Sequence, residues 1–179
     1  MPRLIGLPLP RKEDRRLLTG AGRFTDDLNI PGQTYAAFVR SPHAHARVQG
    51  IDSSAALALP GVIAVLTAAD YAADGCGPIA HMPNPASTLD VKQRAFHAAP
   101  GAQIFDQPRW PLSGDCVRHV GEAVAMVIAR TPALARDALE LVEVDWAPLP
   151  AVATIADALA EDAPQLWSGA PKNLCFSEI

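Results

Sequence analysis

The sequence lacks several features that would assign a class of protein directly. No apolar run approaches the roughly 18 residues of a membrane-spanning helix, and the N-terminus has no apolar segment of the kind found in signal peptides. The net charge is −4 and no block of basic residues is present, which argues against nucleic acid as the principal partner. We therefore expect neither membrane insertion nor nucleic-acid binding.

Cysteine is scarce and its spacing is uninformative. Cys76, Cys116 and Cys175 are odd in number, and none of them forms a C-x-x-C pair. A disulfide framework needs paired cysteines, and a zinc or redox site usually needs closely spaced ones. The cysteine content therefore favours a reduced, cytoplasmic setting.

Recognisable catalytic motifs are also missing. No G-x-S-x-G nucleophile elbow occurs, although serine, histidine and aspartate are present. Gly20 and Gly22 suggest a phosphate-binding loop at first sight. A loop of that kind needs a third glycine, a buried strand before it and a helix after it, and the sequence offers none of these. We interpret the two glycines as turn residues.

Histidine provides two candidate sites. His43 and His45 would share one face of a strand and could bind a metal, but a site needs two more ligands and no acidic or cysteine cluster is close in sequence. The alternative is that these histidines bond to the backbone. His119 and Glu122 could form an acid–base pair. Because they flank Gly121, which is expected in a turn with positive φ, a structural or interface role is favoured.

One cysteine stands beside acidic and imidazole side chains. Cys116 follows Asp115 and precedes His119 by three positions, which resembles a nucleophile cluster. Proximity along an extended strand does not create the geometry of a nucleophile and its base. We therefore predict no catalytic, cofactor-binding or metal-binding residue. From its residues alone, the chain is a soluble mixed α/β domain without a demonstrable active site.

The strongest pattern runs from Val117 to Trp146. An uninterrupted apolar run, Ala123 to Ala129, predicts a buried strand. Thr131 and Pro132 then supply a helix N-cap and a suitable first helical residue. After the helix, apolar and acidic residues alternate up to Trp146, as in a half-buried strand. Strand, helix and strand in about thirty residues predict a right-handed crossover between parallel neighbours.

A shorter unit of the same kind runs from Val48 to Leu66. It contains two short apolar strands, with a helical turn between them that Pro60 and Gly61 end. The aromatic and β-branched content of Thr34 to Arg40 predicts a further strand before it. The likeness of the two units is one of pattern and does not establish an internal repeat.

Proline divides the rest of the chain. The 17 prolines are nearly twice the usual share of about 5%, which predicts many irregular connections. We expect an extended N-terminal arm over residues 1–32, an α+β domain over 33–160 with an irregular insertion at 74–111, and a tail or linker over 161–179. Capping-box spacing predicts helices that start after Thr67, Ser87 and Thr154.

Four segments, taken together, resemble one family. They are RKEDRRLLTGAGRFTDDLNIPGQTYAAFVRSPHAHARV from Arg11, IDSSAALALPGVIAVLTAAD from Ile51, VRHVGEAVAMVIA from Val117 and ALELVEVDWAPLPAV from Ala138. Their order and spacing are similar to the N-terminus of the large, molybdenum-binding subunit of the xanthine dehydrogenase, aldehyde oxidase and aerobic carbon monoxide dehydrogenase family. The resemblance implies an α/β hammerhead fold, built here on the two strand–helix–strand units.

The resemblance also implies what this chain does not carry. In the family, the molybdopterin-binding segments, the substrate pocket and the catalytic glutamate lie downstream of the hammerhead, and the iron–sulfur clusters and flavin belong to other subunits or domains. Molybdopterin cytosine dinucleotide, iron–sulfur clusters and FAD are therefore expected only in the complete enzyme. The implied partners are a molybdopterin-binding chain and an iron–sulfur subunit. An isolated hammerhead would expose the surface that its partner covers, so we predict a homodimer or a sizeable apolar patch when the chain is isolated.

Three functions remain as hypotheses. The first is a non-catalytic hammerhead domain or subunit of a molybdenum hydroxylase, either separately encoded or part of a longer chain. The second is a stand-alone interaction or small-molecule-binding module that has kept the fold without the enzyme. The third is a self-contained enzyme that uses His43, His45 or Cys116.

Overall fold

The computed structural model describes residues 6–79, 105 and 107–174. The chain forms two compact units, Met1–Gln33 and Thr34–Ile179. The first unit contains a short helix, α1 (Asp14–Leu18), and a 3-10 turn, η1 (Thr25–Asp27). The side chain of Asp27 accepts a hydrogen bond from the backbone N–H of Phe24 at 2.8 Å. The segment that we expected to be extended thus has local helical structure.

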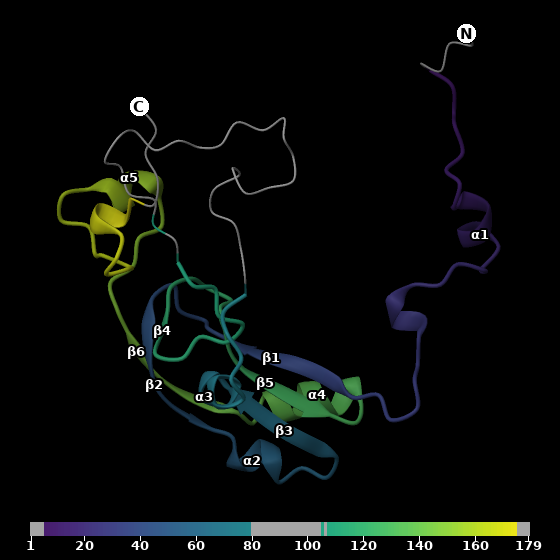
Figure 1. Ribbon diagram of the computed structural model, residues 1–179, viewed down its shortest axis with the longest axis horizontal. Helices are drawn as coiled ribbons and strands as arrows, with labels where there is room; N and C mark the ends of the chain where they lie inside the picture. Colours follow the sequence, from purple (N-terminus) through teal and green to yellow (C-terminus); the bar gives the residue numbers. More distant parts are fainter. Residues whose placement is uncertain (1–5, 80–104, 106, 175–179) are drawn as a thin grey trace. The chain divides into compact units, whose positions relative to one another are not determined.

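The second unit is built on two three-stranded antiparallel sheets (Figure 1). The strand order is β1-β5-β3 in the first sheet and β4-β2-β6 in the second. The elements, in chain order, are β1 (Tyr35–Arg40), β2 (Ala46–Asp52), α2 (Ser54–Leu57), β3 (Val62–Thr67), α3 (Ala68–Ala73), β4 (Cys116–Val117), β5 (Ala123–Ala129), α4 (Pro132–Leu139), β6 (Glu143–Pro148), α5 (Ile155–Leu159) and η3 (Pro171–Asn173). The prediction of a mixed α+β fold is confirmed.

The two strand–helix–strand units exist, but the predicted parallel crossover is wrong. Strand β5 is the centre of the first sheet, and β6 is an edge of the second, so α4 carries the chain from one sheet to the other. Helix α2 does the same between β2 and β3. The units instead pair with each other, because β2 lies antiparallel to β6 and β3 antiparallel to β5. An apolar run predicts that a strand is buried and does not show which strand lies beside it.

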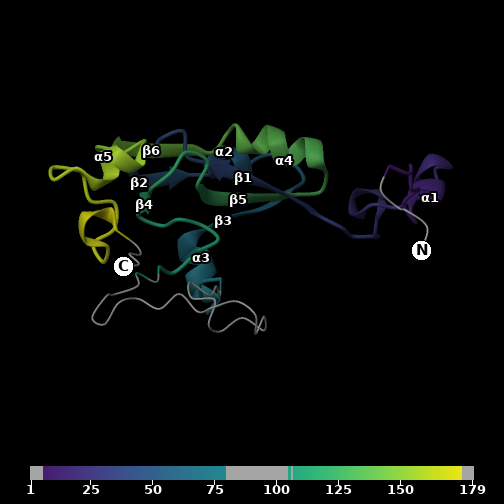
Figure 2. The ribbon, with the colours of Figure 1, turned by 90° about the horizontal axis from the view of Figure 1, so that it is seen from above.

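Helix α4 covers one face of the first sheet. Thr131 accepts a hydrogen bond from the N–H of Leu134 at 3.2 Å, and Pro132 occupies the first helical turn, as predicted. The small side chains of Ala135 and Ala138 are buried, which lets the helix lie close to β1 and β5. Figure 2 shows α2 and α4 on one side of the strands and α3 on the other.

Threonine caps start two further helices, as the capping-box spacing predicts. The carboxylate of Asp70 accepts hydrogen bonds from the hydroxyl and the N–H of Thr67 at 2.7 and 2.8 Å, and these bonds lower its pKa. Thr154 accepts from the N–H of Asp157 at 3.1 Å at the start of α5. The helix predicted after Ser87 lies outside the described residues. Among those residues, no helix is both long and apolar enough to cross a membrane.

The turn before β5 adopts the conformation that its glycine predicts. Gly121 has a φ of 88°, a region that L side chains rarely occupy. Its N–H donates to the carbonyl of Ser41 at 2.8 Å, and its carbonyl accepts from the guanidinium of Arg40 at the same distance. The turn is therefore tied to the end of β1.

Candidate functional site

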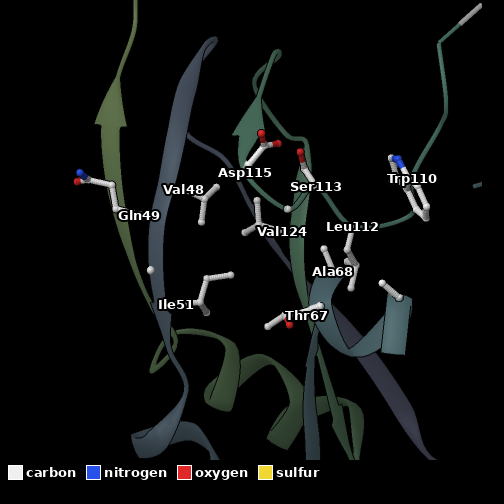
Figure 3. Close-up of a pocket in the computed structure, with 14 residues that line it drawn as sticks. Val48, Gln49, Ile51, Thr67, Ala68, Trp110, Leu112, Ser113, Asp115 and Val124 are labelled. Atoms are coloured by element: carbon white, nitrogen blue, oxygen red, sulfur yellow. The ribbon is translucent and has the colours of Figure 1, made fainter. Parts of the chain in front are cut away.

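A cleft of about 700 Å³ lies on the second unit (Figure 3). It lies between β2, α3, the segment from Trp110 to Asp115 and the start of β5. In Figure 3, Val48 and Ile51 of β2 point into the cleft, and Gln49 between them points away. The cleft is therefore lined mainly by apolar and small side chains.

Short backbone contacts hold the wall that faces β2. The N–H of Ser113 donates to the carbonyl of Ala123 at 2.7 Å, and the N–H of Val48 donates to the carbonyl of Asp115 at 3.0 Å. Farther along the same wall, the ring of Trp110 packs edge-on against Tyr71, with centroids 6.5 Å apart. These contacts join the segment to β2, α3 and β5.

Two hydroxyl groups in the wall of the cleft are bonded within the protein. The hydroxyl of Thr67 donates to Asp70, and the hydroxyl of Ser113 donates to the carbonyl of Cys116 at 2.7 Å. The first bond belongs to the cap of α3, and the second joins Ser113 to the backbone of β4. The apolar and small side chains that line the rest of the cleft suit it to holding apolar groups.

Cys116 lies in β4, just before the turn that leads into β5. The thiol is buried, with 7% of the residue exposed, and burial raises its pKa. His119 and Glu122 do lie together, with Nδ1 and Oε2 3.4 Å apart, but the histidine side chain is 69% exposed. The same carboxylate oxygen accepts the N–H of Arg118 at 2.5 Å. The pair thus closes the turn before β5, as the structural interpretation predicts.

A prediction about thiol reactivity follows from this burial. Only a thiolate is nucleophilic, and a raised pKa with little access suppresses its formation. We expect Cys116 of the folded chain to react with iodoacetamide at least about tenfold more slowly than the exposed Cys76. Peptide mapping by mass spectrometry separates the sites, and unfolding in urea should equalise their rates. Equal rates in the folded chain would support a reactive cysteine.

His43 and His45, the candidate metal ligands, make different structural contacts. His45 is buried, and its Nδ1 lies 2.6 Å from the carbonyl oxygen of Pro150. The ring of His43 packs edge-on against Trp146, with centroids 5.6 Å apart. The backbone bond that we proposed as the alternative to a metal is confirmed for His45. Among the described residues, no three His, Cys, Asp or Glu side chains are grouped to hold a metal ion.

The two glycines of the apparent phosphate loop belong to the first unit. Gly20 lies in the turn that follows α1, and its N–H donates to the carbonyl of Leu17 at 3.1 Å. No strand precedes them in the described part of that unit. The interpretation as a turn residue is confirmed for Gly20, whereas Gly22 lies in irregular backbone just beyond that turn.

Sequence reasoning missed the contact that holds residues 161–174, which we call the C-terminal segment. The guanidinium of Arg118 lies 3.7 Å from the centre of the Trp167 ring. Its Nε donates to the carbonyl of Leu166, and its Nη1 donates to the carbonyl of Cys116, both at 2.9 Å. No local pattern signals a contact between side chains 49 positions apart.

A single asparagine organises the end of the C-terminal segment. The side-chain oxygen of Asn173 accepts the N–H of Leu166 at 2.9 Å. Its amide nitrogen donates to the carbonyls of Ala158 and Pro164 at 3.1 and 3.0 Å. The segment that we predicted as a tail or linker is thus joined to α5 and, through Arg118, to the end of β4.

The comparisons with known proteins agree with one another. The family model "aldehyde oxidase and xanthine dehydrogenase, a/b hammerhead domain" matches residues 19–97 and 86–150. The large subunit of nicotine 6-hydroxylase from Paenarthrobacter nicotinovorans is 43% identical over 78% of this chain and 15% of its own. The large chain of carbon monoxide dehydrogenase from Afipia carboxidovorans is 38% identical over 90% of this chain and 17% of its own.

The solved structures give the same result. The aldehyde oxidoreductase of Desulfovibrio gigas aligns with a TM-score of 0.70 and 32% identity, over 90% of this chain and 16% of that one. This chain therefore spans less than one-fifth of the length of these relatives. The curated relatives are named as large subunits or large chains, so each is one component of a multisubunit enzyme. The chain belongs to the aldehyde oxidase and xanthine dehydrogenase family and carries its α/β hammerhead domain.

Proposed function

We propose that this chain is the hammerhead part of a molybdenum hydroxylase and serves assembly of that enzyme rather than its chemistry. One observation carries the proposal. The chain matches a single domain, and the relatives that contain this domain are several times longer than the matched part. The hydroxyls of Thr67 and Ser113 in the cleft, which are bonded to Asp70 and to the backbone of Cys116, are consistent with the same conclusion. The substrate would be selected by parts of the enzyme outside this chain.

The cofactors of such an enzyme would be held elsewhere. The described residues offer no grouped set of metal ligands, and His45 is already bonded to the backbone. We therefore assign no molybdenum-binding role to these residues and derive no chemical step through a molybdenum centre. Molybdopterin cytosine dinucleotide, iron–sulfur clusters and FAD would belong to a molybdopterin-binding chain, an iron–sulfur subunit and their associated domains, in the cytoplasm.

The proposal divides the chain by role. Residues 33–160 would form the hammerhead, residues 1–32 would lie along a partner as an arm, and residues 161–179 would lead toward the molybdenum-binding part. The separation of the two compact units at Gln33 and Thr34 supports the first boundary. The anchoring of the C-terminal segment by Arg118 supports a defined path for the chain beyond α5.

Co-expression tests the proposal. The partner is the large chain of the Afipia carboxidovorans carbon monoxide dehydrogenase, from which the segment that matches this chain is deleted. We expect an affinity-tagged copy of this chain to recover the shortened large chain, because the deletion leaves that chain without its hammerhead. A tagged protein of unrelated fold is the control. Recovery no greater than the control would contradict an assembly role.

A second candidate is a small-molecule-binding module, and the volume of the cleft favours it. Ligand pockets usually measure about 300–1,000 Å³ and combine apolar walls with a few polar groups. The cleft meets the first condition, but its hydroxyls are directed at protein atoms. Binding of an apolar probe such as anilinonaphthalene sulfonate, lost in Val48→Trp without loss of partner recovery, would support this candidate.

A further inference from the structure

The first sheet has an apolar face that α4 does not cover. In antiparallel sheets, directly paired residues place their side chains on the same side. The pairing of β1 and β3 with β5 therefore creates two rows of three apolar residues, which together we call the open face. The open face consists of Phe38, Met126 and Leu66 in one row and Ala36, Ile128 and Ala64 in the other.

The opposite face of the first sheet is covered by α4 and serves as a comparison. Val39, Ala125 and Val127 are buried beneath α4, with exposures of 8%, 0% and 0%. No residue of the open face is fully buried, and 38% of Phe38 is exposed. The same three strands thus have one closed side and one accessible side.

The composition of the open face differs from that of a solvated sheet. An antiparallel sheet with one side in water normally alternates apolar and polar residues. Strand β5 instead reads AVAMVIA, without a polar position. The nearest charged side chain on β1 is Arg40, whose guanidinium lies 5.6 Å from the centre of the Phe38 ring, at the margin of the rows. An apolar centre with an arginine at its rim is typical of a protein interface.

We propose that the open face is the surface on which the molybdenum-binding remainder of the large subunit docks, through apolar side chains that Phe38 anchors. This proposal rests on the proposed function. The occupant is inferred from length: relatives contain more than four-fifths of their large chain beyond the part that this chain matches. A polypeptide of that size, joined to this domain in the relatives, would be large enough to cover the open face.

The test compares two substitutions of equal exposure in the co-expression experiment. Phe38→Ser removes the proposed anchor. Leu141→Ser removes an apolar side chain that is 39% exposed, on the turn between α4 and β6, outside the open face. Removing an aromatic anchor from the centre of an interface typically weakens binding by about tenfold or more. We expect that loss of affinity for the shortened large chain with Phe38→Ser and less than about twofold with Leu141→Ser.

Each outcome has one interpretation. Failure of the unaltered chain to bind contradicts the proposed function, and the surface with it. Binding of the unaltered chain that Phe38→Ser leaves unchanged contradicts the surface alone. A dimer of this chain that depends on Phe38 and persists in the presence of the partner would assign the open face to a second copy. If Phe38→Ser fails to fold, Phe38→Lys, whose aliphatic stem still covers the sheet, replaces it.

Discussion

Replacement of Gly61 by valine is expected to lower the free energy of unfolding by about 2–4 kcal/mol. Gly61 joins α2 to β3 with a φ of 96°, and a Cβ there would lie 2.8 Å from Cδ2 of Leu134 on α4. The branched side chain would thus be strained by its backbone and would also displace Leu134. Because Gly61 lies where the two strand–helix–strand units meet, the change tests their pairing. Urea titration monitored by tryptophan fluorescence measures it.

Substitutions at two other glycines separate the effect of backbone strain from the effect of the close contact with Leu134. Gly121 has a φ of 88° but no atom within 4 Å of its Cβ position, so Gly121→Val reports backbone strain alone. Gly50 has neither a positive φ nor a close neighbour. We expect the loss of stability to decrease in the order Gly61, Gly121, Gly50. A valine at Gly61 that is no more harmful than one at Gly50 would contradict the described packing of α4.

Arg118→Met is the second substitution with a large expected effect. It removes two hydrogen bonds and the cation–π contact with Trp167 while it keeps an unbranched side chain. The expected loss is about 2 kcal/mol of unfolding free energy. The C-terminal segment should also become more accessible to protease. Release of Trp167 from its packed site should shift tryptophan emission to longer wavelength.

Arg136→Met is the matched control for that experiment. Arg136 is exposed on α4, and removing a single surface charge usually changes stability by less than about 0.5 kcal/mol. Its proteolysis pattern and emission should match those of the unaltered chain. If both substitutions have the same small effect, Arg118 does not hold the C-terminal segment.

Local patterns predict the elements of this fold more readily than their partners. The apolar run Ala123–Ala129 predicts β5 with its observed bounds, and Thr131 with Pro132 predicts the start of α4, because both signals come from neighbouring residues. The assignment of β5 and β6 to different sheets depends on pairing with β3 and β2, far away in sequence. A strand has the same alternation of residues whichever strand lies beside it. The passage of the chain from one sheet to the other between β5 and β6 could therefore not be predicted.

The candidate site shows the same limit. The turn conformation of Gly121 is a property of one residue and was predictable. Arg118 contacts Trp167, which lies 49 residues later in the chain. His45 lies beside the carbonyl of Pro150, which is 105 residues later. The unbroken apolar content of β5 predicted a buried strand, whereas the residues on one of its faces, Met126 and Ile128, are only partly buried. The accessibility of the open face depends on which side of the first sheet α4 covers, and only the structure shows which side that is.

Native mass spectrometry of the co-expressed complex tests the assembly role most directly. The instrument first weighs the intact complex of this chain with the shortened carbon monoxide dehydrogenase large chain and then separates the two polypeptides. We expect one copy of each polypeptide in the complex, and molybdenum in the larger one after separation. Molybdenum that stays with this chain, or this chain recovered only by itself, would contradict a non-catalytic assembly role.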